Sequence, residues 1–179
     1  LKPPRKTMLD LLKDAGRDVI AVGKIFDIFD GEGVTEKIKT TGNTNGIAFT
    51  KALQTRDFEG LAFVNLVDFD MLYGHRRDVA GYAAAATEFD KFVADFIPGM
   101  REGDILMVTA DHGCDPSYTK TTDHTREYVP YLICGKGVKP GVDLGTKLCF
   151  GTIAHTICDY LGVDASTLDG QSVLSDILA

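Results

Sequence analysis

The chain has 179 residues, of which 44% are hydrophobic. A chain of this length fits one domain and buries roughly 70% of its unfolded surface in a core. The formal net charge is −7 and basic residues form no long run, so the electrostatic pattern of a nucleic-acid-binding protein is missing. No apolar run approaches the ~20 residues of a membrane span, and no secretory leader is recognisable. We therefore expect neither nucleic acid nor membrane as a partner.

The first half of the chain alternates between helical and extended patterns. A short capped helix is predicted over 7–15, followed by a β-rich run over 18–29 with a break at Gly23. Residues 43–55 have a helical pattern. The nearly continuous apolar run over 60–70 is typical of a strand that is covered on both faces.

The clearest helix of the second half is predicted over 81–97, where apolar side chains recur at helical spacing. They are Phe89, Phe92, Val93, Phe96 and Ile97. A stripe of this kind indicates a core-facing surface, so we interpret these phenylalanines as core residues and not as a cofactor site.

Two further strands are predicted over 104–110 and 129–135, with a polar loop over 113–125 between them. A helix is predicted over 152–162, with Gly162 as its C-terminal cap. Helices that alternate with apolar strands predict an α/β fold, with a mostly parallel sheet and helices on both faces.

Four cysteines lie in the second half, and their spacing contains neither a C-x-x-C pair nor a zinc-ribbon pattern. They are Cys114, Cys134, Cys149 and Cys158. We expect reduced, mostly buried thiols in a cytoplasmic protein.

Aspartate and histidine gather where predicted strands begin or end. Three of the four histidines lie within a few residues of an aspartate, in the segment 68–75 and in the pairs Asp111-His112 and Asp123-His124. A single aspartate after a strand is commonly a cap or turn former, and a lone histidine is commonly a surface residue. Three such groups together indicate a site, because ligands bind at the carboxyl ends of strands in open α/β sheets.

Imidazole nitrogen together with carboxylate oxygen is the ligand set of zinc and manganese sites, whereas calcium and magnesium prefer oxygen alone. Two such ions about 3.5–4 Å apart can hold a phosphoryl group during an in-line displacement. The sequence therefore predicts a metal site that gathers ligands from several strand ends and acts on a phosphate.

Four runs of the sequence together resemble the phosphopentomutase family of the alkaline phosphatase superfamily, which is related to cofactor-independent phosphoglycerate mutase. The runs are GKIFDIFDGEG over 23–33, NLVDFDMLYGHRRD over 65–78, TADHGCDP over 109–116 and TDHTREYVP over 122–130. The resemblance covers most of the chain and implies part of an alkaline-phosphatase-like core.

The resemblance also implies roles for individual residues. One Mn²⁺ would be held by Asp70, His75 and His124, and a second by Asp111 and His112 together with an aspartate from the N-terminal part of the family's proteins. Zn²⁺ or Mg²⁺ are alternatives to Mn²⁺. Lys24 matches a lysine near the substrate, and its alternative interpretation is a solvated lysine at a strand end.

The family reaction moves phosphate between the 5 and 1 positions of ribose or deoxyribose through a phosphothreonine and a bisphosphorylated sugar. By the resemblance, the first strand, the nucleophilic threonine and the cap domain all precede residue 1. We therefore expect residues 1–179 to be the C-terminal portion of the catalytic core, inactive as a mutase alone. We also expect it to associate with the remainder of its polypeptide, or through an exposed sheet edge.

Two other functions remain open from the sequence. The same ligands suit a phosphatase, phosphodiesterase or sulfatase of the superfamily, since they fix the metal chemistry and not the substrate. A non-catalytic metal-binding or assembly module is the alternative from another class.

Several neighbouring residues have weaker expectations. Asp68 and Asp123 are predicted to orient a ligand histidine. Cys114 is expected to be unreactive, and His155 to be a packing or surface residue in its helix. Three arginines either contact phosphate or pair with carboxylates: Arg76, Arg77 and Arg126.

Overall fold

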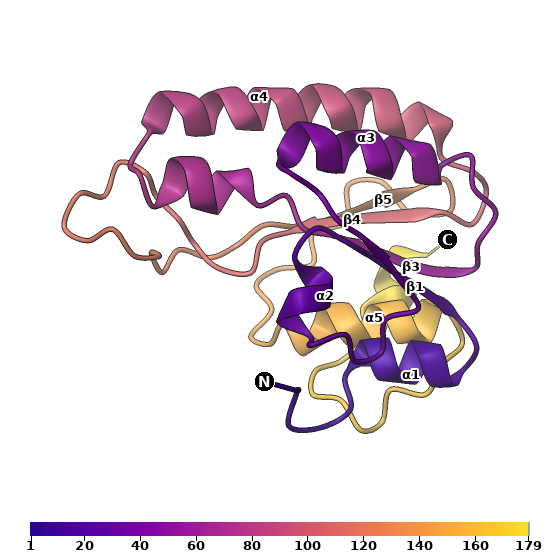
Figure 1. The fold of residues 1–179 in the computed structure, drawn as a ribbon. Coiled ribbons are helices and arrows are strands. Elements are labelled where there is room, and N and C mark those ends of the chain that lie inside the picture. Colours follow the sequence, from indigo (N-terminus) through magenta and orange to yellow (C-terminus); the bar gives the residue numbers. More distant parts are fainter. Residues whose placement is uncertain (179) are drawn as a thin grey trace. The chain divides into compact units, whose positions relative to one another are not determined.

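The computed structural model describes residues 1–178, which divide into two compact units (Figure 1). The first unit comprises Leu1–Lys39, Arg56–Asn65 and the chain from Lys139 onward. The second comprises Thr40–Thr55 and Leu66–Val138.

A three-stranded parallel sheet lies in the first unit. Its strands are β1 (Asp18–Val22), β2 (Glu36–Ile38) and β3 (Gly60–Val64), in the order β2-β1-β3. Four of the five residues of β1 are buried, as expected for an apolar strand with a neighbour on each side. The parallel arrangement requires the chain to cross over between strands, and α2 (Ile25–Ile28) lies on the connection from β1 to β2.

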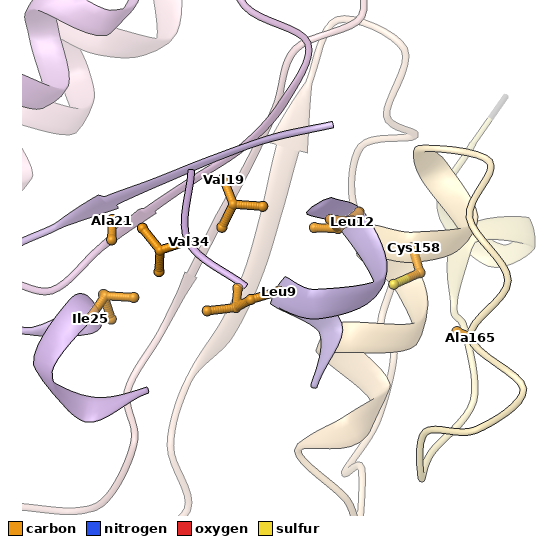
Figure 2. Close-up of a cluster of buried hydrophobic side chains, with 8 residues drawn as sticks. All are labelled: Leu9, Leu12, Val19, Ala21, Ile25, Val34, Cys158 and Ala165. Atoms are coloured by element: carbon orange, nitrogen blue, oxygen red, sulfur yellow. The ribbon is translucent and has the colours of Figure 1, made fainter. Parts of the chain in front are cut away.

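The core of the first unit lies between this sheet and its helices (Figure 2). Leu9 and Leu12 of α1 (Met8–Asp14) are fully buried. They join Val19 and Ala21 of β1 and Cys158 of α5 (Gly151–Tyr160). Removing such apolar area from water is the main favourable term in folding. The remaining helix, α6, spans Leu174–Ile177.

Helix α5 ends in a left-handed glycine. Gly162 has φ +68°, its N–H donates to the carbonyl of Asp159 (3.1 Å), and the Val163 N–H donates to the carbonyl of Cys158 (2.8 Å). This pair of bonds is the Schellman motif, which satisfies carbonyls that the helix leaves unpaired. The predicted stop at Gly162 is confirmed.

The second unit contains two packed helices and a two-stranded ladder. Its elements are α3 (Asn43–Leu53), the π-helix η1 (Phe69–Gly74), α4 (Val79–Phe96), the 3₁₀-helix η2 (Ile97–Gly99), β4 (Ile105–Thr109) and β5 (Tyr131–Gly135). Helices α3 and α4 lie side by side (Figure 1), joined by Lys51 to Asp95 (3.1 Å) and by Gln54 to the carbonyl of Phe96 (2.7 Å). Phe92 of α4 is buried, as predicted.

The α/β class and the parallel sheet are confirmed, but two predicted features are wrong. Beyond Gly23 the run 18–29 is the helix α2 and not a strand, because the left-handed Gly23 (φ +82°) turns the chain out of β1. The predicted strand 60–70 stops at Val64, and the π-helix η1 follows. The strands predicted over 104–110 and 129–135 are confirmed as β4 and β5, which pair antiparallel because no crossover helix separates them. Helices on both faces of one sheet stay a prediction.

Among residues 1–178, no helix combines the length and apolar character needed to cross a bilayer.

The Gly162 cap gives a test of the first unit. Replacement Gly162→Ala should lower the free energy of unfolding by about 1 kcal/mol, because a Cβ is unfavourable at positive φ. Gly162→Asn should cost less, since asparagine tolerates this region. Urea unfolding followed by circular dichroism measures both, and equal stability of the alanine variant and the wild type would contradict the cap.

Candidate metal centre

The π-helix η1 brings Asp70 and His75 to the same side of the chain. The His75 N–H donates to the carbonyl of Asp70 (3.0 Å), a bond that spans five residues. In an α-helix, side chains five residues apart point about 140° away from each other. The wider π turn closes over five residues, so the two side chains meet. His75 Nε2 lies 3.3 Å from Asp70 Oδ1.

A short β-bridge brings the other two histidines together. Gly113 and Thr125 pair as an isolated antiparallel bridge, and the Thr125 N–H donates to the Gly113 carbonyl (3.0 Å). This bridge brings the two segments together, and the rings of His112 and His124, which each precede a bridge residue, reach each other diagonally across it. Their rings stack with centroids 3.5 Å apart and an angle of 18° between the planes.

His124 also completes the cluster around Asp70. Its Nε2 lies 3.4 Å from Asp70 Oδ1, and its ring centroid lies 5.0 Å from that of His75. Asp70, His112 and His124 each offer a ligand atom, and these atoms lie within 4.8 Å of one another. The structure thus brings together the predicted set Asp70, His75 and His124, with His112 beside it.

The protonation of His75 follows from its partners. Its Nδ1 lies 2.5 Å from the carbonyl of Thr122. A carbonyl only accepts, so Nδ1 carries the proton and, in the neutral ring, Nε2 presents a lone pair. His112 repeats this arrangement, with Nδ1 3.1 Å from the carbonyl of Gly113.

These geometries fit a bound cation. His75 Nε2 faces a carboxylate oxygen at 3.3 Å, a contact that is favourable when a cation or a proton lies between the two atoms. Two ligands of one tetrahedral ion with bonds of 2.0–2.2 Å are about 3.4 Å apart. The separations of His75 and His124 from Asp70, 3.3 and 3.4 Å, agree with this value.

Cys114 packs between Gly74 and the carboxylate of Asp70. Gly74 is buried so close to Cys114 that a Cβ would overlap the sulfur. The Cys114 Sγ lies 3.7 Å from Asp70 Oδ1. Burial raises the pKa of the Cys114 thiol above its usual range, and the nearby Asp70 carboxylate raises it further.

Within residues 1–178, Asp111 makes no hydrogen bond or ion pair with Asp70, and Lys24 belongs to the other unit. Asp111 Oδ2 is 3.6 Å from His112 Nε2, and the Asp111 side chain is 73% exposed. Lys24 is an exposed residue of the first unit, at the N-terminus of α2 and directly after β1. Roles for Asp111 in metal binding and for Lys24 at a phosphate stay predictions.

The expected role of Asp68 is wrong. Its carboxylate accepts from the N–H of Asn43 (2.6 Å), and its own N–H donates to Asn43 Oδ1 (2.9 Å). Asp68 therefore fixes the start of α3, and within residues 1–178 it makes no hydrogen bond or ion pair with a histidine.

His155 lies as expected, whereas Asp123 contacts the main chain of His124 and its orienting role stays a prediction. The His124 N–H donates to Asp123 Oδ1 (2.8 Å) and holds the pKa of the Asp123 carboxyl below its usual range. His155 lies in α5 of the first unit, where its Nε2 is 3.1 Å from the carbonyl of Leu168.

Arg77 has a role that the sequence did not reveal. Its guanidinium contacts main-chain carbonyls of the loop before His124, and no carboxylate of residues 1–178 pairs with it. Of the two alternatives left open for Arg77, the described residues show no pairing with a carboxylate, and contact with a phosphate stays a prediction. No local pattern in the run GHRRD distinguishes this arginine from its neighbour Arg76.

Comparison with known proteins agrees with this site. The model of the metalloenzyme superfamily matches residues 10–165. The chain belongs to the metalloenzyme superfamily. Metalloenzyme membership together with the cluster of Asp70, His112 and His124 supports a metal cofactor.

Curated relatives extend the similarity along the whole chain. The chain is 53% identical over 178 residues to a phosphopentomutase of Lachnoclostridium phytofermentans, and 52% identical over 178 residues to one of Acetivibrio thermocellus. Each match covers 99% of the chain and 45% of the relative. The chain thus spans about half the length of these relatives. The predicted resemblance to phosphopentomutases is confirmed.

A solved structure confirms the fold. The chain matches a phosphoglycerate mutase of Leishmania mexicana, described at low cobalt concentration, with a TM-score of 0.71 and 18% identity. The match covers 92% of the chain and 38% of that structure. This supports the predicted alkaline-phosphatase-like architecture of the core.

The four thiols should differ in reactivity. Burial raises the pKa of Cys134 and Cys158, as it does for Cys114, so little thiolate forms at neutral pH, whereas Cys149 is exposed. In metal-free protein at pH 7, iodoacetamide should alkylate Cys149 first. Peptide mass spectrometry over time measures the order, and faster labelling of Cys114 would contradict the protected position of its sulfur.

Proposed function

We propose that the chain is the C-terminal part of the catalytic core of a phosphopentomutase, which interconverts ribose or deoxyribose 1-phosphate and 5-phosphate. The observation that carries the proposal is identity of about 50% to phosphopentomutases along 99% of the chain. The convergence of Asp70, His75 and His124 supports it independently, because it supplies the kind of site that such chemistry needs.

In this proposal Asp70, His75 and His124 hold one divalent ion, and Asp111 and His112 contribute to a second. Mn²⁺ is the proposed ion because the resemblance to the phosphopentomutase family implies it, and the mixed set of imidazole and carboxylate argues against calcium, which prefers oxygen ligands alone. When bound, the ions would offset charge on the transferring phosphoryl group and lower the pKa of the attacking hydroxyl.

The chain's own residues prepare this site. The carbonyls of Thr122 and Gly113 fix the Nδ1–H tautomers of His75 and His112, leaving Nε2 of each ring free to bind. Lys24 is proposed as a flexible cation for a substrate phosphate. The nucleophilic threonine belongs, by the family resemblance, to the part of the relatives that this chain does not span.

The alternatives share the same ligands. A phosphatase or phosphodiesterase would use this metal centre on another substrate, and a non-catalytic module would bind the ion alone. Similarity along the whole chain, and not only at the ligands, favours the mutase. We also propose a cytoplasmic location, since all four cysteines are free thiols.

Metal titration tests the ligand assignment. The 179-residue chain should bind Mn²⁺ in calorimetry, and His124→Ala should weaken binding roughly 100-fold, because loss of a ligand exceeds the 10–100-fold cost of losing an outer partner. His155→Ala is the matched control and should bind like the wild type. Equal affinities of all three proteins would refute the site.

A hybrid protein tests the reaction. The chain would replace the matching segment of the Lachnoclostridium phytofermentans phosphopentomutase, whose remaining part supplies the rest of the enzyme. The hybrid should convert deoxyribose 1-phosphate to the 5-phosphate in the presence of Mn²⁺, and Asp70→Ala should abolish the conversion. A folded hybrid that hydrolyses an aryl phosphate but isomerises no pentose phosphate would favour the phosphatase alternative.

A further inference from the structure

Three consecutive carbonyls directly before His124 are held by side chains from the end of η1. Arg77 donates through Nε and Nη2 to the carbonyl of Thr121, with Nε at 2.9 Å, and through Nη2 to that of Asp123 (2.6 Å). His75 Nδ1 contacts the carbonyl between them, that of Thr122 (2.5 Å). Arg77 Nη1 also reaches back to the carbonyl of Asp115 (3.0 Å).

The backbone at Arg77 is shaped for this contact. Arg77 has φ +55°, a left-handed conformation that is uncommon for a residue with a long side chain. Its N–H donates to the carbonyl of Gly74 (3.1 Å), and the next N–H, that of Asp78, donates to the carbonyl of Tyr73 (2.9 Å). Such strain persists only where surrounding interactions hold it, and the bonds from the guanidinium to the loop are those interactions.

We propose that Arg77 is a positioning residue for the metal centre, acting through His124. By fixing the carbonyls of Thr121 and Asp123, it holds the loop so that the His124 imidazole already points Nε2 at Asp70. The proposal rests on the proposed metal-binding function, to which it adds a residue outside the ligand set. A ligand that is in place before the ion arrives costs less conformational entropy on binding.

An arginine suits this task better than a lysine. The guanidinium is planar and carries five N–H donors in a fixed fork, so one side chain can serve carbonyls from three residues at once. A lysine offers one compact ammonium group at the end of a flexible stem. The neighbouring Arg76 is exposed and makes no hydrogen bond or ion pair within residues 1–178, which makes it a matched control.

A double-mutant cycle on Mn²⁺ affinity tests the proposal in the 179-residue chain. Arg77→Ala should weaken Mn²⁺ binding by roughly 10–100-fold, the usual cost of losing an outer partner of a ligand, and Arg77→Lys should recover little of it. Arg76→Ala should bind like the wild type. In a His124→Ala background, Arg77→Ala should cause no further loss, because its effect passes through the missing imidazole.

Two further readouts separate positioning from general stabilisation. Millimolar guanidinium should restore part of the affinity of Arg77→Ala, and the visible spectrum of bound Co²⁺ in this variant should shift toward that of His124→Ala. A purely structural arginine would instead give additive losses in the cycle, with an unchanged cobalt spectrum. That result would overturn the proposal.

The outcomes distinguish this proposal from the metal site itself. If the wild-type chain binds no Mn²⁺, the metal site and the role of Arg77 both fail. If the wild type binds and His124→Ala does not, while Arg77→Ala retains full affinity, only the positioning role fails. Circular dichroism of each variant, matched to the wild type, establishes that a loss of affinity is not a loss of fold.

Discussion

The arrangement of the second unit depends on one carboxylate oxygen, Oδ1 of Asp70. The Nε2 atoms of His75 and His124 lie 3.3 and 3.4 Å from it, and the sulfur of Cys114 lies at 3.7 Å. Imidazole lone pairs do not gather around an anion without a cation to share. A positive charge at this point, from a metal ion or from a proton on an imidazole, offsets the carboxylate, and membership of a metalloenzyme superfamily favours the metal ion.

Two different devices assemble the cluster. Asp70 and His75 are close in sequence, and a single π turn places their side chains on the same side of the chain. His112 and His124 are distant in sequence, and the bridge between Gly113 and Thr125 brings their segments together. The local pair depends on the unusual width of one helical turn. The distant pair depends on how a long polar loop is held, which is why side chains outside the ligand set affect its geometry.

The positions of α1, α4 and α5 were predicted well, because each ends near a recognisable glycine or proline. The grouping of aspartate with histidine pointed to the region of the site, and the family resemblance supplied the set Asp70, His75 and His124. Hydropathy could not separate β3 from η1, since Phe69 continues the apolar run that precedes it. The contacts of Arg77 and the cap formed by Asp68 depend on tertiary partners, Thr121 and Asn43, that no local pattern identifies.

The loop before His124 is held through carbonyl oxygens, and every amino acid has one. Of the loop side chains at positions 121–123, those of Thr121 and Asp123 accept main-chain N–H groups within the loop, whereas that of Thr122 takes no part in these contacts. The contacts to the loop from His75 and Arg77 depend instead on the two donating side chains. Position 122 should therefore tolerate substitution better than His75 or Arg77, because only the main chain of residue 122 is used.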